Sequence, residues 1–336
     1  MMANPNYWRG KPNLDEIDIK IVPSREAGLA AVQTGDVDLV EDASEGNIPT
    51  IQAMEPKVHL VTVPGSEFEH LLFNLDPKLG PPFFQDLQVR KAIMLGIDRD
   101  TIVKKLLYGK TNAPADLWPN GPWENTNLKP YPYDPKQAQS ILEADGWKKG
   151  DDGIYAKVIN GKNTRLSFSY MTTSGNQLRA DQQVLITAQL KSIGVEVTIQ
   201  NLPASTYFGT YNDNGPLARG AFQLAGYTTG FYPDPDPGDS FLCSGIPTAD
   251  NPSGGNNYHL CDKKLDDLFK QEVTTPDTAK RKAIIDQIQQ IQYDNVYFVP
   301  LYARLKVWAA NARLVNYKPS YNGHIYWDAW EWAVTQ

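Results

Sequence analysis

The sequence is poor in the residues that hold metal ions. It has only two cysteines and four histidines, and none of them falls into a CxxC or HxxxH spacing. Closely spaced ligands of this kind are the usual signature of a zinc site. The histidines, of which only His259 lies near a cysteine, are His59, His70, His259 and His324. The sequence therefore predicts no metal site and no cofactor.

Long apolar runs and blocks of positive charge are missing as well. No stretch approaches the roughly 18 apolar residues that a membrane-spanning helix needs, so we expect no spanning segment. The net charge is −7, and charges of both signs are mixed along the chain. A protein that binds nucleic acid usually carries a basic patch, so nucleic acid is not an expected partner.

Catalytic motifs are missing too. We find no GxSxG elbow for a hydrolase triad, no P-loop and no GxGxxG following a strand. The sequence therefore predicts a protein that is not an enzyme, with a hydrolase kept only as a remote alternative.

What is present is typical of a globular protein with more than one core. The 336 residues are 41% hydrophobic and 21% charged, and this length predicts two lobes. Eight Trp and 17 Tyr exceed what is usual for a chain of this size. Most of them should pack in the core, and the others suit the lining of a ligand cleft.

The two cysteines predict a disulfide. Cys243 and Cys261 flank a stretch of loop residues without helical or strand periodicity. A bond between them would stabilise this loop and would point to an oxidising compartment; two unrelated thiols are the alternative. No signal peptide is found in the opening residues MMANPNYW, so we expect that the given chain lacks the start of the protein.

The hydrophobic pattern alternates between strands and helices. Two strand–helix–strand units predict parallel pairing, one over 17–40 and one over 166–202. The other expected strands are 58–63, 67–75, 222–227 and an apolar run over 296–307. The other expected helices are 87–108, 135–144, 265–272 and 278–294. This order predicts an α/β protein with mixed sheets flanked by helices.

A loop rich in proline and aspartate follows the strand at 222–227. Prolines at 233, 235 and 237 fix the backbone in an extended form. The carboxylates Asp234, Asp236 and Asp239 could face water, contact a ligand, or serve as metal ligands or catalytic acids. Aromatic rings beside fixed carboxylates suit a ligand with an apolar body and a cationic end.

Several motifs, in order along the whole chain, resemble family 5 extracellular solute-binding proteins. They include NPNYW, the stretch Thr34–Asp38, the stretch Phe73–Leu75, the run Gln88–Ile93, Tyr133–Pro135 and Val299–Tyr302. The resemblance implies a two-lobe periplasmic-binding-protein-like fold (type II, cluster C) with an incomplete lobe I. Residues 1–78 would belong to lobe I, 79–299 to lobe II, and 300–336 would return to lobe I.

The resemblance also implies a function outside the cytoplasm. Such proteins bind oligopeptides, dipeptides, nickel chelates or other small solutes between the lobes and deliver them to a membrane ABC permease. The full-length protein would be periplasmic or at the cell surface, secreted or lipid-anchored. A peptide-like ligand is therefore expected, with a saccharide or another small uncharged solute as the alternative.

The expected ligand contacts lie on both sides of the lobe crossings. They are Tyr227, Phe231, Asp234 and Asp236, with Phe68, His70 and Asn74 near the first crossing and Tyr302 at the return crossing. In peptide-binding members an Asp shortly after the cleft aromatic pairs with the peptide's α-ammonium group. The corresponding position here falls on or near Gly230, which has no carboxylate, and Asp234 or Asp236 could take its place.

Overall fold

The chain divides into two compact units, which are described separately. The computed structural model describes residues 1–230, 236–320 and 325–335. Unit 1 comprises Met1–Gly65, Lys104–Thr111 and Arg304–Gln336, and unit 2 comprises Ser66–Val103 and Asn112–Ala303. The chain therefore passes between the units four times: within two long strands, within one helix and in the loop between Thr111 and Asn112. The lobe boundaries expected from the sequence stay a prediction.

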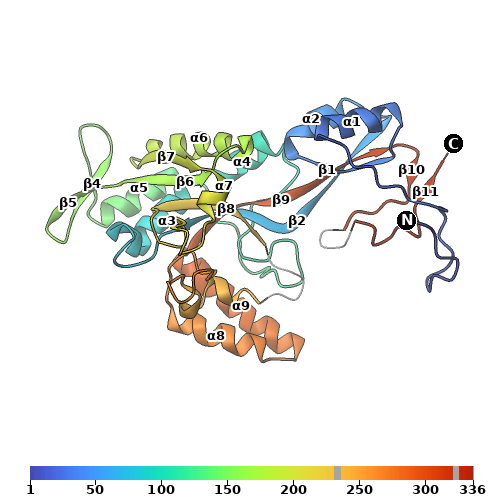
Figure 1. Cartoon of the computed structure of the whole chain (residues 1–336). Helices are drawn as coiled ribbons and strands as arrows, with labels where there is room; N and C mark the ends of the chain where they lie inside the picture. Colours follow the sequence, from blue (N-terminus) through green and yellow to red (C-terminus); the bar gives the residue numbers. More distant parts are fainter. Residues whose placement is uncertain (231–235, 321–324, 336) are drawn as a thin grey trace. The chain divides into compact units, whose positions relative to one another are not determined.

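Unit 1 holds short elements at both ends of the chain. They are α1 (Arg25–Thr34), β1 (Leu39–Ala43), η1 (Glu45–Asn47), α2 (Ile48–Gln52), the start of β2 (Val58–Phe73), the end of β9 (Phe298–Asn311), β10 (Leu314–Val315) and β11 (Ala333–Val334) (Figure 1). β1 pairs antiparallel with the end of β9, and β10 pairs antiparallel with β11. Ser24 caps α1 by accepting a hydrogen bond from the Ala27 amide.

The strand expected over 17–22 is wrong, and with it the parallel pairing expected in this unit. Residues 17–22 form neither helix nor strand. The alternation of IDIKIV favours an extended chain, but a strand needs a neighbour with which to pair its backbone. The only bridge close to it joins Met2 and Glu16 in the described part of the chain.

Unit 2 is built on a mixed sheet. Its strands are β6 (Ser167–Thr173), β7 (Glu196–Leu202), β8 (Leu224–Gly230), the end of β2 and the start of β9, in the order β9-β2-β8-β6-β7. β6 pairs parallel with β7 and with β8, whereas β2 pairs antiparallel with β8. A separate small sheet contains β3 (Lys148–Lys149), β4 (Tyr155–Ile159) and β5 (Lys162–Arg165).

Helices cover both faces of the unit 2 sheet. α6 (Gln177–Ser192) lies over one face, and α8 (Lys263–Val273) and α9 (Thr278–Asn295) lie side by side below the other (Figure 1). The remaining helices are η2 (Pro82–Gln85), α3 (Leu87–Gly96), α4 (Arg99–Leu106), which ends in unit 1, α5 (Pro135–Ala144), α7 (Ala204–Tyr207), η3 (Gly238–Ser240) and η4 (Cys243–Gly245). Both expectations of mixed sheets and flanking helices are confirmed.

Local signals explain where the helices of unit 2 begin and end. Asp134 caps α5 at the Gln137 amide, with Pro135 in the first turn, and the helix has the bounds that the sequence predicts. The single helix expected over 87–108 is two helices, because the chain is extended at Ile97 and Asp98 caps a new start. α6 ends before Gly194, whose φ of +85° favours glycine, and a Cβ there would collide with Tyr155.

The two long strands differ in detail from the expectation. Residues 58–73 form one strand where two were expected, and β9 continues through Pro300 to Asn311. The strand–helix–strand unit over 166–202 is confirmed with its parallel pairing. Large side chains that are completely buried form the core of unit 2: Tyr155, Tyr170, Tyr207, Tyr302, Phe68, Phe73, Phe84, Phe241 and Phe269.

Candidate ligand-binding site

The register of β2 against β8 sorts the candidate residues into two faces. His70 pairs with Tyr227, Glu69 with Thr228, and Phe68 with Thr229. Because side chains alternate along a strand, His70 and Tyr227 share the face toward α8 and α9, and Glu69 and Thr228 share the face toward α6.

Tyr227 is half-buried and lies in a cluster of rings. Its ring meets the edge of the His70 ring at 4.7 Å between centroids and that of Phe208 at 5.6 Å. Burial raises the pKa of Tyr227 to about 12, and a hydrogen bond with the Asn257 side chain acts in the opposite direction. Phe208 is 50% exposed. The two rings therefore offer an aromatic surface that a ligand can reach, held from behind by His70.

His70 is enclosed and neutral. The residue is completely buried, and its Nε2 lies 3.0 Å from the Tyr258 hydroxyl. Burial lowers the pKa of His70 to about 3, because the protein interior disfavours the imidazolium. His70 therefore supports the Tyr227 ring and cannot provide a positive charge near neutral pH.

Three further predicted contacts are also enclosed in unit 2. Phe68 is completely buried beside Phe298. The Asn74 amide donates to the carbonyls of Gly220 and Phe222, each at 2.9 Å. The buried hydroxyl of Tyr302 lies 2.9 Å from Gln182 Oε1. These contacts explain a packing role, and contact of the three side chains with a ligand stays a prediction.

The acidic loop is described only in part. Phe231 and Asp234 lie outside the described residues. Asp236 is exposed, and its carboxylate accepts a hydrogen bond of 2.9 Å from the Gly238 amide. It lines an open hollow of about 780 Å³ together with Trp123, Arg281 and the end of α8. Contact of Asp236 with a ligand stays a prediction.

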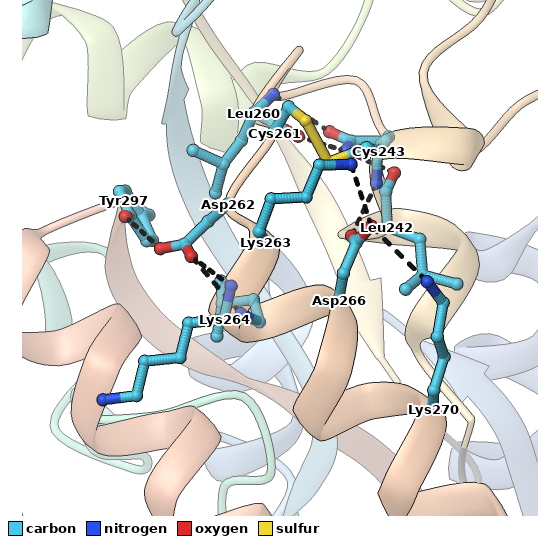
Figure 2. Close-up of a disulfide and its surroundings, with 12 residues drawn as sticks. Leu242, Cys243, Leu260, Cys261, Asp262, Lys263, Lys264, Asp266, Lys270 and Tyr297 are labelled. Atoms are coloured by element: carbon cyan, nitrogen blue, oxygen red, sulfur yellow. Dashed lines mark hydrogen bonds and ion pairs between the residues drawn. A yellow bond between two sulfur atoms is a disulfide. The ribbon is translucent and has the colours of Figure 1, made fainter.

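The predicted disulfide is confirmed, and it secures the loop beside Tyr227. Cys243 and Cys261 are bonded across 18 positions (Figure 2). The Cys243 amide donates to the Asp266 carboxylate at 2.8 Å, which fixes one end of the loop to α8. At the other end Asp262 caps α8 and accepts a hydrogen bond of 2.8 Å from the Tyr297 hydroxyl.

The loop that the disulfide closes, residues 243–261, carries two site residues that the sequence analysis missed. Asn257 contacts the Tyr227 hydroxyl, and Tyr258 contacts His70. Tyr258 also stacks on Phe241 at 4.9 Å, and its carbonyl accepts from the Leu75 amide. The only available signal was an aromatic residue three positions before a cysteine that was expected to be bonded.

The opposite face holds a buried ion pair that was also missed. Arg179 Nε lies 2.8 Å from Oε1 of the completely buried Glu69. The guanidinium also donates to Thr173 and Thr228. Burial by itself would lower the pKa of Arg179, but the charge of Glu69 outweighs it and the pKa is raised. These partners satisfy the charges and fix α6 against β2 and β8.

In chemical terms the arrangement consists of aromatic rings, amides and enclosed charges. Within residues 1–230, 236–320 and 325–335, no group of three or more His, Cys, Asp or Glu is placed to hold a metal. No described helix combines the length and apolarity needed to cross a membrane.

The fold is that of bacterial oligopeptide-binding proteins. The chain superposes with a TM-score of 0.75 and 27% identity on the oligopeptide-binding protein from Thermus thermophilus complexed with a pentapeptide, covering 93% of this chain and 55% of that one. The oligopeptide-binding protein AppA from Bacillus subtilis, in complex with a nonapeptide, gives a TM-score of 0.73 and 25% identity over 100% of this chain and 63% of that one.

The family follows from the sequence match. Residues 1–250 match the family described as bacterial extracellular solute-binding proteins, family 5 (middle), and the chain belongs to that family. The nickel-binding periplasmic protein of Escherichia coli K12 is 27% identical over 89% of this chain and 55% of its own length. The chain therefore spans about half the length of this curated relative. Members of this family are binding proteins found outside the cytoplasm.

Proposed function

We propose that the whole protein captures a peptide-like solute outside the cytoplasm and delivers it to a membrane ABC permease. The observation that carries this proposal is the half-buried Tyr227 ring, which is supported by His70 and Asn257 and is continuous with the exposed Phe208 ring. Rings held in this way stack on a flexible ligand at little cost in conformational entropy. The protein would be secreted or lipid-anchored.

A carboxylate for the cationic end of such a ligand lies beside Gly230. Glu67 is exposed and is the cross-strand partner of Gly230. A Cβ added to Gly230 would lie 2.7 Å from Glu67 Cγ, so the Glu67 side chain fills the space that a residue at 230 would use. Glu67 and Gly230 lie on the face of the sheet that Glu69 and Thr228 share, whereas Tyr227 lies on the other face. Because β8 ends at Gly230, we propose that an extended ligand which contacts the Tyr227 ring passes the end of β8 and reaches the Glu67 carboxylate there.

The alternative ligand is a saccharide or another uncharged solute. It is favoured by the absence of any side chain at Gly230, where the resemblance places the acidic residue. A peptide-like ligand and an uncharged ligand differ in how much the Glu67 carboxylate contributes to binding. A positively charged ligand end needs its carboxylate, whereas an uncharged ligand does not.

Melting temperatures with and without ligand test the proposal. Defined tri- and tetrapeptides should raise the melting temperature of the chain, because a ligand that binds only the folded state stabilises it. Tyr227→Ala should abolish this rise, whereas Tyr133→Ala, which removes another exposed tyrosine of unit 2, should retain it. A shift that is equal in both variants would contradict the assignment of Tyr227.

The charge of the ligand is tested separately. Glu67→Gln should weaken binding of peptides with a free α-ammonium group by roughly tenfold, the size of one charged hydrogen bond. N-acetylated peptides should bind the wild type and the variant equally. A peptide pool without effect, together with a shift caused by neutral saccharides, would favour the alternative ligand.

A further inference from the structure

A small cavity inside unit 2 is lined by polar and charged side chains. It measures about 10 Å³, and Asp116, Gln289, Gln292 and Arg99 are among the residues that line it. The exposed fractions of these four residues lie between 1% and 4%. Polar groups enclosed to this degree need hydrogen-bond partners, because burying them without one costs stability.

The two glutamines carry three unpaired atoms at this cavity. Gln289 and Gln292 are three positions apart on α9, so they share a face of that helix. Gln289 Nε2 donates a hydrogen bond of 3.0 Å to the Trp123 carbonyl, which identifies its other amide atom as Oε1, and that oxygen has no partner among the described residues. Within the same part of the chain neither Nε2 nor Oε1 of Gln292 has a partner, so turning this amide over changes nothing.

The charged groups at the cavity balance each other. The Asp116 carboxylate accepts hydrogen bonds from the amides of Trp118 at 2.9 Å and Asn125 at 2.7 Å, and the Arg99 guanidinium donates to the Tyr131 carbonyl. Burial raises the pKa of Asp116 to about 6 and lowers the pKa of Arg99 to about 10, so both are charged at pH 7. One negative and one positive group together favour a neutral polar occupant over a metal ion or an anion.

The size of the cavity limits this occupant to one water molecule. A site needs about 10–15 Å³ to hold one buried water, which typically makes about three hydrogen bonds. A water molecule donates two hydrogen bonds and accepts two. The unpaired donor of Gln292 and the unpaired acceptors of both glutamines supply partners of each kind.

We propose that this cavity binds one water molecule, held by the Gln289 and Gln292 amides and beside the charged groups of Asp116 and Arg99. All of these residues belong to unit 2, and the site is enclosed by unit 2 alone. The inference does not depend on the proposed function.

The water fastens an irregular segment to α9. Residues 112–134 form neither helix nor strand. Three hydrogen bonds join this segment to one face of α9: Asn125 to the Asp286 carbonyl, Gln289 to the Trp123 carbonyl, and the Tyr131 hydroxyl to the Tyr293 carbonyl. Asp116 belongs to the same segment, so the bound water adds a further link between the segment and the helix.

A crystal structure of the full chain that shows ordered water identifies the occupant. We expect one peak of solvent density within hydrogen-bond distance of Gln289 Oε1 and of the Gln292 amide. Soaking further crystals in bromide or in rubidium distinguishes an ion, because both scatter anomalously. An anomalous peak in the cavity, or a Gln292 amide without solvent density beside it, would overturn the proposal.

The sign of a stability change gives an independent test. Gln292→Met replaces the amide by an apolar group of similar size. If the amide binds water, the variant loses those hydrogen bonds, and its melting temperature should fall by roughly 2–4 °C. If the amide had no partner at all, removing a buried polar group should raise the melting temperature instead.

A second glutamine of α9 provides the matched control. Gln287 is exposed, so Gln287→Met should melt within about 1 °C of the wild type. A Gln292→Met variant that melts at or above the wild-type temperature would contradict the water site. Circular dichroism checks that both variants are folded, and the wild-type crystal structure decides the question without them.

Discussion

In unit 2, β6 and β7 pair over seven consecutive residues, whereas in unit 1 no strand among the residues that the structure describes pairs with the segment 17–22, for which the sequence predicts the same strand–helix–strand order. Both segments alternate apolar and polar residues, and both are followed by a well-capped helix. The difference is the neighbourhood: β6 has β7 on one side and β8 on the other. An alternating pattern thus specifies which face of a strand would be buried, and the partner strand decides whether the strand forms.

The largest expected loss of stability concerns the buried ion pair of unit 2, which Arg179 and Glu69 form. Arg179→Met leaves the enclosed Glu69 carboxylate without the Arg179 cation, and we expect the free energy of unfolding to fall by about 3–5 kcal/mol. Urea unfolding followed by circular dichroism measures it. The control is Arg165→Met, which removes an exposed arginine bound to Glu196 and should have a much smaller effect. Equal losses in both variants would show that burial of the pair does not matter.

The second effect concerns the closed loop. Replacing Cys243 and Cys261 by serine should lower the free energy of unfolding by about 3 kcal/mol, since the cross-link restricts the unfolded chain. The same variant should also weaken ligand binding, because Asn257 and Tyr258 then lose their fixed loop. Unfolding with and without a reducing agent gives the comparison for the wild type. Unchanged binding in the serine variant would contradict the positioning role of the loop.

The third effect is a dependence of the free energy of unfolding on pH, caused by His70. The pKa of His70 is lowered to about 3 in the folded state, so the unfolded state, with an ordinary pKa of about 6.5, binds the proton first. Above pH 6.5 His70 is neutral in both states and does not lower the free energy of unfolding. Below pH 6.5 the free energy of unfolding falls by about 1.4 kcal/mol for each pH unit, until the pH reaches the folded pKa of about 3.

Two histidine variants isolate this dependence. Unfolding measured between pH 7 and 5 should show a weaker slope in His70→Phe than in the wild type. His59→Gln, which changes an exposed histidine in unit 1, should keep the wild-type slope. A slope that follows His59 in place of His70 would contradict the assignment.

The smallest effect concerns helix starts in the two units. Asp98→Ala removes the side chain that accepts from the Thr101 amide at the start of α4 and should cost about 1 kcal/mol. Asp98→Asn should restore most of this stability, because asparagine caps as well as aspartate. Ser24→Ala at the start of α1 gives the corresponding measurement in unit 1. Thermal unfolding of the three variants measures the differences, and an unaffected Asp98→Ala variant would show that the cap is unimportant.

Much of unit 2 could be predicted from local sequence. The pattern over 166–202 predicted β6, α6 and β7 because strand alternation, a helical stretch and the stop at Gly194 follow one another there. Within the region expected as one helix over 87–108, the Asp98 side chain caps a second start by accepting from the Thr101 amide. The break at Ile97 itself was missed, because the apolar spacing continues across it.

The site was harder to predict because its contacts are distant in sequence. Glu69 and Arg179 are 110 positions apart, and His70 and Tyr258 are 188 positions apart. Tyr227 was singled out as an aromatic residue at the end of a strand, but no periodicity indicated that Asn257 would contact it. Sequence also cannot distinguish a buried tyrosine such as Tyr302 from a half-exposed one such as Tyr227, since both lie in apolar strands.

Native mass spectrometry tests the central claim most directly, namely that Tyr227 belongs to a surface that binds a peptide-like solute. The freshly purified chain is mixed with defined peptides and with neutral saccharides of similar mass, beside Tyr227→Ala and Tyr133→Ala. Our account predicts one-to-one peptide adducts on the wild type and on Tyr133→Ala, and none on Tyr227→Ala. Peptide adducts that persist on Tyr227→Ala, or saccharide adducts in place of peptide adducts, would contradict it.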